Sequence, residues 1–335
     1  MNIKADKFKS LIAVDKKRRI IKIPNKVMRK QRWAADQDKH LAPNSICIVC
    51  NFSYYYKDRG WSNNVKAICH PFKTTSMFPN NIDLHLFSES DFCDPMWMPD
   101  IKLLANRSDY EYDFFCYTID SGQGVRCKGA YALPLIFQVA KESGMNGLLL
   151  DYYPKFPRPA CLEPEGRDKQ VREVRSLLKK MDNIKIERGW FDQTKINNLM
   201  NRCKFVIFPN TNDASPRTIP ETLLRGKPIL VNKNILGGWK YVKENNGQLF
   251  DCASDYEQFN KNRDFYYEEI KRSLIAMKER KDDSKIVNRS FLDEYGFERS
   301  SKRLAKIINR IEGHKKYRYV AYKEFRSYLE MIKGK

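Results

Sequence analysis

Two carboxylates, Asp213 and Glu221, lie eight positions apart around the start of a predicted short helix. The apolar run 205–208 precedes them and suits a strand that is buried on both faces. Ligands of open parallel sheets bind where such strands end, so both side chains can point into one crevice. Carboxylates are hydrogen-bond acceptors, so a ligand in that crevice could donate to both of them.

The residues around this pair predict a β-α-β unit. Thr218, with Glu221 three residues later, has the spacing of a capping box, and Gly226 suits the end of the helix before the next apolar run at 228–231. The N–H groups at the start of such a helix favour an anionic ligand. A purely structural explanation stays open, in which Asp213 caps a turn and Glu221 only completes the capping box.

Several motifs follow one another in a fixed order over residues 204–250. They are Asp213-x7-Glu221, Gly226-Lys227-Pro228-Ile229-Leu230, Gly237-Gly238 and Asn246-Gly247-Gln248-Leu249-Phe250. This series resembles the nucleotide-sugar site of group-1 glycosyltransferases, which are GT-B enzymes with two facing Rossmann-like domains. Asp213 stands where that family has a Glu. The sequence is also similar to short members of the family from large algal viruses.

The resemblance implies a glycosyltransferase that moves a sugar from a nucleoside-diphosphate sugar, such as a UDP- or GDP-sugar, to an acceptor hydroxyl of a glycan or glycoconjugate. Glu221 then binds the ribose hydroxyls, and Asp213 contacts the transferred sugar. Because Asp213 is one methylene shorter than the family's Glu, the motif does not decide between a retaining and an inverting outcome. The sequence does not name the donor sugar, the acceptor or the linkage.

The resemblance also implies cations for the diphosphate. Lys128, followed by Gly129, matches the family's Lys-Gly, and Arg126 lies close enough to replace the family's Arg. Ser215, Arg217 and Thr218 would lie along the diphosphate or the sugar, with Arg217 supplying charge. Gly237 and Gly238 let the backbone approach a ligand. Simpler structural explanations stay open, in which Arg126 and Lys128 are solvated cations in a loop and the two glycines form a simple turn.

The acceptor side carries weaker signals. His70, Asp58 and Asp94 are candidates for an acceptor base, each with a structural role as the alternative. No metal is predicted, because GT-B enzymes do not require one and the sequence has no Asp-x-Asp motif. Cys47 and Cys50 would face opposite sides of one strand, and no second pair completes a zinc site.

The composition limits the classes of protein. The chain has 335 residues, a net charge of +21 and 42% hydrophobic residues, so we expect a globular protein with two domains. Nine cysteines without an export signal predict a cytoplasmic protein. The charge favours polyanions, such as an anionic membrane surface contacted peripherally. The sequence has no nucleic-acid-binding signature, so nucleic acid is not the expected partner. Two alternative functions stay open: a basic module that binds nucleic acid or a membrane surface, and a sugar-nucleotide epimerase.

The predicted fold is α/β, of the GT-B type, with a reduced N-terminal domain and C-terminal helices. Residues 1–110 form the Rossmann-like acceptor-side domain, and 111–312 form the nucleotide-sugar-binding domain. Alternating strands and helices from 112 to 231 predict a parallel sheet with right-handed crossovers. Residues 313–335, basic and aromatic, are predicted to form a helix that packs on the N-terminal domain.

Overall fold

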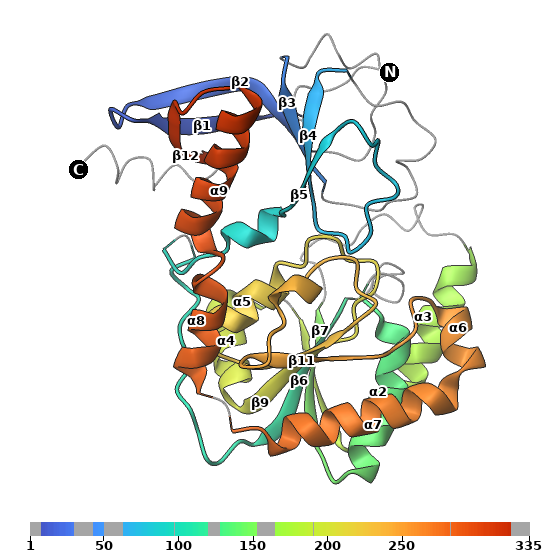
Figure 1. The fold of residues 1–335 in the computed structure, drawn as a ribbon. Helices are drawn as coiled ribbons and strands as arrows, with labels where there is room; N and C mark the ends of the chain where they lie inside the picture. The colour runs from blue at the N-terminus through green and yellow to red at the C-terminus, as the bar shows by residue number, and fades with distance from the viewer. Residues whose placement is uncertain are drawn as a thin grey trace. The chain divides into compact units, whose positions relative to one another are not determined.

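The computed structural model describes residues 8–29, 43–49, 63–96, 98–119, 128–152, 165–189, 191–281 and 283–322. The chain divides into two compact units (Figure 1). The first unit comprises Met1–Met98, Ala214–Arg217 and Leu292–Lys335, and the second comprises Pro99–Asp213 and Thr218–Phe291. This division differs from the predicted one, because the boundary falls near residue 98 and the last long helix groups with the first unit.

The second unit is built on a six-stranded parallel sheet. Its strands, in the order β11-β10-β9-β6-β7-β8, are β6 (Tyr112–Ile119), β7 (Gly147–Tyr152), β8 (Ile184–Gly189), β9 (Cys203–Phe208), β10 (Ile229–Asn232) and β11 (Gly247–Phe250). The chain runs outward from β6 to β8, returns to β9 beside β6, and then runs outward the other way. This is the Rossmann strand order, and its switch point lies between β6 and β9.

Helices surround this sheet (Figure 1). They are α2 (Leu133–Glu142), α3 (Glu165–Leu178), α4 (Gln193–Asn201), α5 (Thr218–Leu224), α6 (Tyr256–Lys261), α7 (Arg263–Glu279) and α8 (Ser284–Leu292). The prediction of a parallel α/β sheet is confirmed. Phe114 on β6 packs against Phe137 on α2 and Phe205 on β9, all fully buried, so apolar burial holds the helix layer on the sheet. Thr218 is the first residue of α5 and not the residue before it, so the predicted capping box is wrong.

The first unit contains a mixed six-stranded sheet in the order β12-β1-β2-β3-β4-β5. Strand β1 (Phe8–Asp15) pairs antiparallel with β2 (Ile20–Arg29) and with β12 (Tyr317–Tyr322). Strands β2, β3 (Ser45–Ile48), β4 (Val65–His70) and β5 (Asp83–Leu86) are parallel. Helix α9 (Gly296–Ile311) packs on this sheet through Leu304 and Phe297, beside Phe92.

The predicted C-terminal helix is wrong for residues 317–322, which form β12. Val320 and Ala321 are buried there, and Ala321 lies opposite Ile12 of β1, so pairing with a sheet edge decides the conformation. Residues 323–335 lie outside the described residues. Among the helices described, none combines the length and the apolar character that crossing a membrane requires.

Candidate functional site

The switch point of the second unit brings Lys128 and Asp213 together. Lys128 lies two residues before the turn Ala130–Ala132 that leads into α2, and Asp213 lies in the loop that follows β9. The Nζ atom of Lys128 forms an ion pair with Oδ2 of Asp213. The side chains are 29% and 12% exposed, so the pair is partly shielded from water. The sequence predicted both residues for one site but not their contact.

A backbone approach fixes these two loops against each other. Gly129 has a φ angle of +65°, and a Cβ atom placed there would lie 1.9 Å from the carbonyl oxygen of Pro209. Only glycine fits both the left-handed backbone and this contact. The position of Lys128 beside Asp213 therefore depends on the lack of a side chain at the next residue.

The loop after β10 joins the same edge of the sheet. The N–H group of Gly237 donates to the carbonyl of Asp213 at 2.9 Å, and that of Leu236 donates to the carbonyl of Thr211 at 2.8 Å. Gly238 has a φ angle of +92° and precedes the turn Trp239–Tyr241. The loops of three adjacent strands, β6, β9 and β10, thus meet around Asp213, and the two glycines are part of this junction.

Asn210 is a site residue that the sequence analysis missed. Its Nδ2 atom donates to Oδ2 of Asp213 at 2.9 Å, and the residue is only 5% exposed. Lys128 and Asn210 therefore hold the same carboxylate oxygen, and no described residue forms a hydrogen bond with Oδ1. The described residues therefore position the Asp213 carboxylate through its Oδ2 atom. An amide side chain three residues before Asp213 was the available signal in the sequence.

Glu221 lies on α5 and is half-buried. Burial raises the pKa of Tyr117 on β6, Arg225 lowers it, and the charge of Glu221 raises it further. The Glu221 carboxylate is therefore close enough to influence the Tyr117 hydroxyl. The main chain around Glu221 is held by Arg225, a fully buried residue that donates to the Glu221 carbonyl at 2.8 Å and to Asn197 Oδ1 at 2.7 Å.

The other predicted donor-site residues are not brought together with Lys128 by the described contacts. Ser215 and Arg217 belong to the segment that groups with the first unit, where Ser215 Oγ lies 2.7 Å from Ser90 Oγ and Arg217 is exposed. The carbonyl of Thr218 accepts from Thr222 Oγ1 at 2.7 Å within α5. Arg126 lies outside the described residues.

The acceptor-base candidates belong to the first unit. Asp94 Oδ2 accepts from the N–H group of Phe297 at 3.0 Å, which fastens the start of α9, and Oδ1 accepts from that of Met96 at 2.9 Å. These contacts give Asp94 a structural role. His70 is 5% exposed and packs against Phe72 and Phe78, while Asp58 lies outside the described residues. In the described part of the chain, no three His, Cys, Asp or Glu residues are placed to hold a metal ion.

Comparisons with solved structures identify the fold. No protein-family model and no curated protein matches this sequence. The lipopolysaccharide outer core galactosyltransferase WaaB matches with a TM-score of 0.53 at 11% identity, covering 82% of this chain and 78% of WaaB. Sucrose-phosphate synthase from Thermosynechococcus elongatus matches with a TM-score of 0.52 at 9% identity, covering 86% and 74%.

The GtfA/B complex matches with a TM-score of 0.52 at 12% identity over 83% of this chain. This chain spans 59% of the matched GtfA/B chain and 54% of TarM, another structure that it matches. Identities this low show the fold alone. The chain has the α/β fold of the GT-B glycosyltransferases, as its motifs predicted.

Proposed function

We propose that this chain is a glycosyltransferase that binds a nucleoside-diphosphate sugar in its second unit and transfers the sugar to a hydroxyl of a glycan or glycoconjugate. The observation that carries the proposal is the ion pair of Lys128 and Asp213 at the switch point of a Rossmann-ordered sheet. That edge is where open α/β sheets bind nucleotides. The fold shared with WaaB, described as a galactosyltransferase, supports the same conclusion.

The chemistry assigned to these residues follows from charge. Cleavage of the glycosidic bond leaves a diphosphate with growing negative charge, which a fixed ammonium group stabilises. Lys128 supplies this group in our proposal, assisted by Arg126. Thr218 would add a hydroxyl donor, and Gly237 with Gly238 would let the backbone approach the donor.

Two carboxylates would hold the two sugars of the donor. Glu221 accepts hydrogen bonds from the ribose hydroxyls. Asp213 presents Oδ1 to the transferred sugar, because Lys128 and Asn210 occupy Oδ2. The proposed reaction needs the donor and the acceptor but no bound metal. Peripheral contact with an anionic membrane is part of the proposal and rests on the net charge of +21.

A thermal-shift panel of UDP, GDP, ADP and their sugars tests the donor site. A ligand that binds only the folded protein at about 100 times its Kd adds about 2.7 kcal/mol of stability, which raises the midpoint by several degrees. Glu221→Ala should abolish the shift, whereas Glu244→Ala, which changes an exposed carboxylate in the same unit, should keep it. Asp213→Ala should keep the shift but lose transfer.

The outcomes separate the parts of this proposal. If no nucleotide raises the midpoint of the wild-type protein, the donor site is wrong. If Glu221→Ala responds to nucleotide as strongly as Glu244→Ala does, the ribose is held elsewhere.

A further inference from the structure

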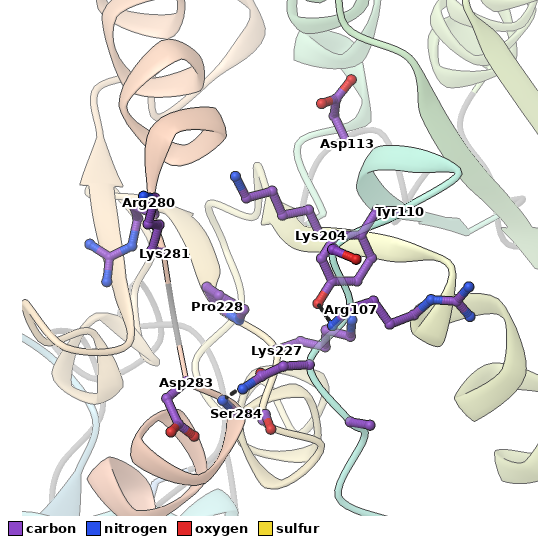
Figure 2. A pocket seen from close by; sticks show the side chains of 14 residues that line it. Arg107, Tyr110, Asp113, Lys204, Lys227, Pro228, Arg280, Lys281, Asp283 and Ser284 are labelled. Carbon is purple, nitrogen blue, oxygen red and sulfur yellow. Dashed lines mark hydrogen bonds between the residues drawn. The ribbon is translucent and has the colours of Figure 1, made fainter.

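A cavity of about 650 Å³ opens at the amino-terminal edge of the second unit's sheet, the edge opposite Asp213 (Figure 2). Its walls come from the segment before β6, from the starts of β9 and β10, and from the link between α7 and α8. None of its lining residues belongs to the proposed donor site. The Lys227 of the Gly-Lys-Pro motif, for which the proposed reaction has no role, lies in this cavity.

Positive charge predominates among the described lining residues. Five carry a cationic side chain and two carry a carboxylate; they are Arg107, Lys204, Lys227, Arg280 and Lys281 against Asp113 and Asp283. Three of the cations donate to neutral backbone carbonyls: Lys204 to that of Lys278, Lys227 to that of Cys203 at 2.7 Å, and Arg280 to that of Glu244 at 2.8 Å. Carbonyl oxygens satisfy these donors without cancelling their charge.

The roles of the cations differ. Arg107 pairs with Asp109, and Arg280 turns toward Glu244, so both contribute mainly through their long-range field. Lys204 extends from β9 toward the end of α7 (Figure 2). Lys281 is exposed, and no ion pair joins it to a described residue. Lysines on three walls can therefore reach a ligand in the cavity, namely Lys204, Lys227 and Lys281.

The positive charge of Lys227 is not balanced by a described carboxylate. The residue is 3% exposed, its ammonium group lies 4.4 Å from the centre of the Tyr110 ring, and no described carboxylate forms an ion pair with it. Burial lowers its pKa to about 8, Cys203 opposes this, and Arg107 lowers it further. A buried ammonium without a counter-charge is costly, and a bound anion offsets that cost.

We propose that this cavity binds a phosphate-bearing small molecule, with Lys204, Lys227 and Lys281 contacting its phosphate oxygens. The excess of three positive charges among the described lining residues favours a multiply charged oxyanion over a single carboxylate. The volume exceeds that of one phosphate group and falls in the range of small-molecule pockets, so it leaves room for the organic part of a metabolite.

Calorimetric titration with inorganic pyrophosphate tests this proposal. The Lys128→Ala protein serves as the reference, because the donor site also attracts diphosphates. Adding Lys281→Glu should weaken binding by about tenfold or more, since a cation that contacts the ligand becomes an anion. Adding Lys285→Glu, which makes the same charge change on an exposed residue outside the lining set, should alter affinity less than about twofold.

Proton uptake gives an independent readout at pH 8.5. A bound anion raises the pKa of Lys227, so binding should take up protons, measured as a difference in heat between two buffers. Among the described residues, the other charged or titratable groups around the cavity or beside Lys227 are Arg107, Tyr110, Asp113, Cys203, Lys204, Arg280, Lys281 and Asp283. Lys227→Met should remove this uptake.

The proposal is overturned if pyrophosphate fails to bind the Lys128→Ala protein even at ~10 mM, a concentration above the usual range of affinities for metabolites. It is also overturned if Lys281→Glu and Lys285→Glu change the affinity for pyrophosphate equally. Neither outcome bears on the proposed donor site, because nucleotide binding and the Glu221→Ala variant test that site separately. Because Lys281 is exposed, its replacement should not disturb folding, so the test does not depend on the buried Lys227.

Discussion

Replacing Gly129 with Ala tests whether the loops after β6 and β9 meet as described. A Cβ atom at this residue lies 1.9 Å from the Pro209 carbonyl oxygen, so the two segments must separate by about 1.5 Å to restore an ordinary contact of about 3.4 Å. Gly144 provides a matched control in the same unit. Its φ angle of +62° equals that of Gly129 within a few degrees, and no described atom lies within 4 Å of its Cβ position.

Both substitutions place alanine in the left-handed region, which costs about 1–2 kcal/mol. Only Gly129→Ala adds an overlap, and overpacking of this kind costs about 1–3 kcal/mol more. We therefore expect the free energy of unfolding in urea to fall by about 2–5 kcal/mol for Gly129→Ala and by about 1–2 kcal/mol for Gly144→Ala. UDP affinity should fall only for Gly129→Ala. Equal losses of stability and unchanged UDP binding in both variants would refute the contact between the two loops.

Two further predictions concern lysines at opposite edges of the same sheet. Lys128→Ala should weaken UDP binding by about tenfold or more in a calorimetric titration, because a cation that contacts a phosphate is lost. The control Lys141→Ala, on the exposed side of α2, should leave the affinity for UDP unchanged. Equal affinities of the two variants would place the diphosphate away from Lys128. The pKa of Lys227 is lowered to about 8 by burial, so between pH 8 and 10.5 the unfolded chain holds the proton that the folded protein has released. The stability of the wild type should therefore rise across this window by up to about 3 kcal/mol relative to Lys227→Met in urea unfolding, and parallel pH profiles of the two proteins would contradict the buried lysine.

The sequence predicted the second unit well because its local signals agree with its packing. The apolar run at 205–208 is part of β9, and the run at 228–231 overlaps β10 with a helix between them. These strands are central and buried on both faces, so hydrophobicity alone identifies them. The contact of Lys128 with Asp213 required the strand order, which places β9 beside β6 although about ninety residues separate them.

The first unit was harder to predict because its conformation depends on pairing between distant segments. Tyr319 and Tyr322 are three residues apart, as on a helix face, whereas Tyr317 and Tyr319 alternate as in a strand, and the edge of β1 selects the strand. Strand β4 was missed, because the short run Val65–His70 carries Lys66 and gains its order from β3 and β5. Asn210 was missed because an amide near a turn is common, and only the fold shows that it holds Asp213.

A crystal structure of this protein with UDP tests the central claim most directly. We predict that the diphosphate lies at the carboxyl ends of β6 and β9 with a phosphate oxygen within hydrogen-bonding distance of Lys128 Nζ, and that the ribose hydroxyls contact Glu221. UDP bound at any other place on the chain, with Lys128 still paired only to Asp213, would contradict the account.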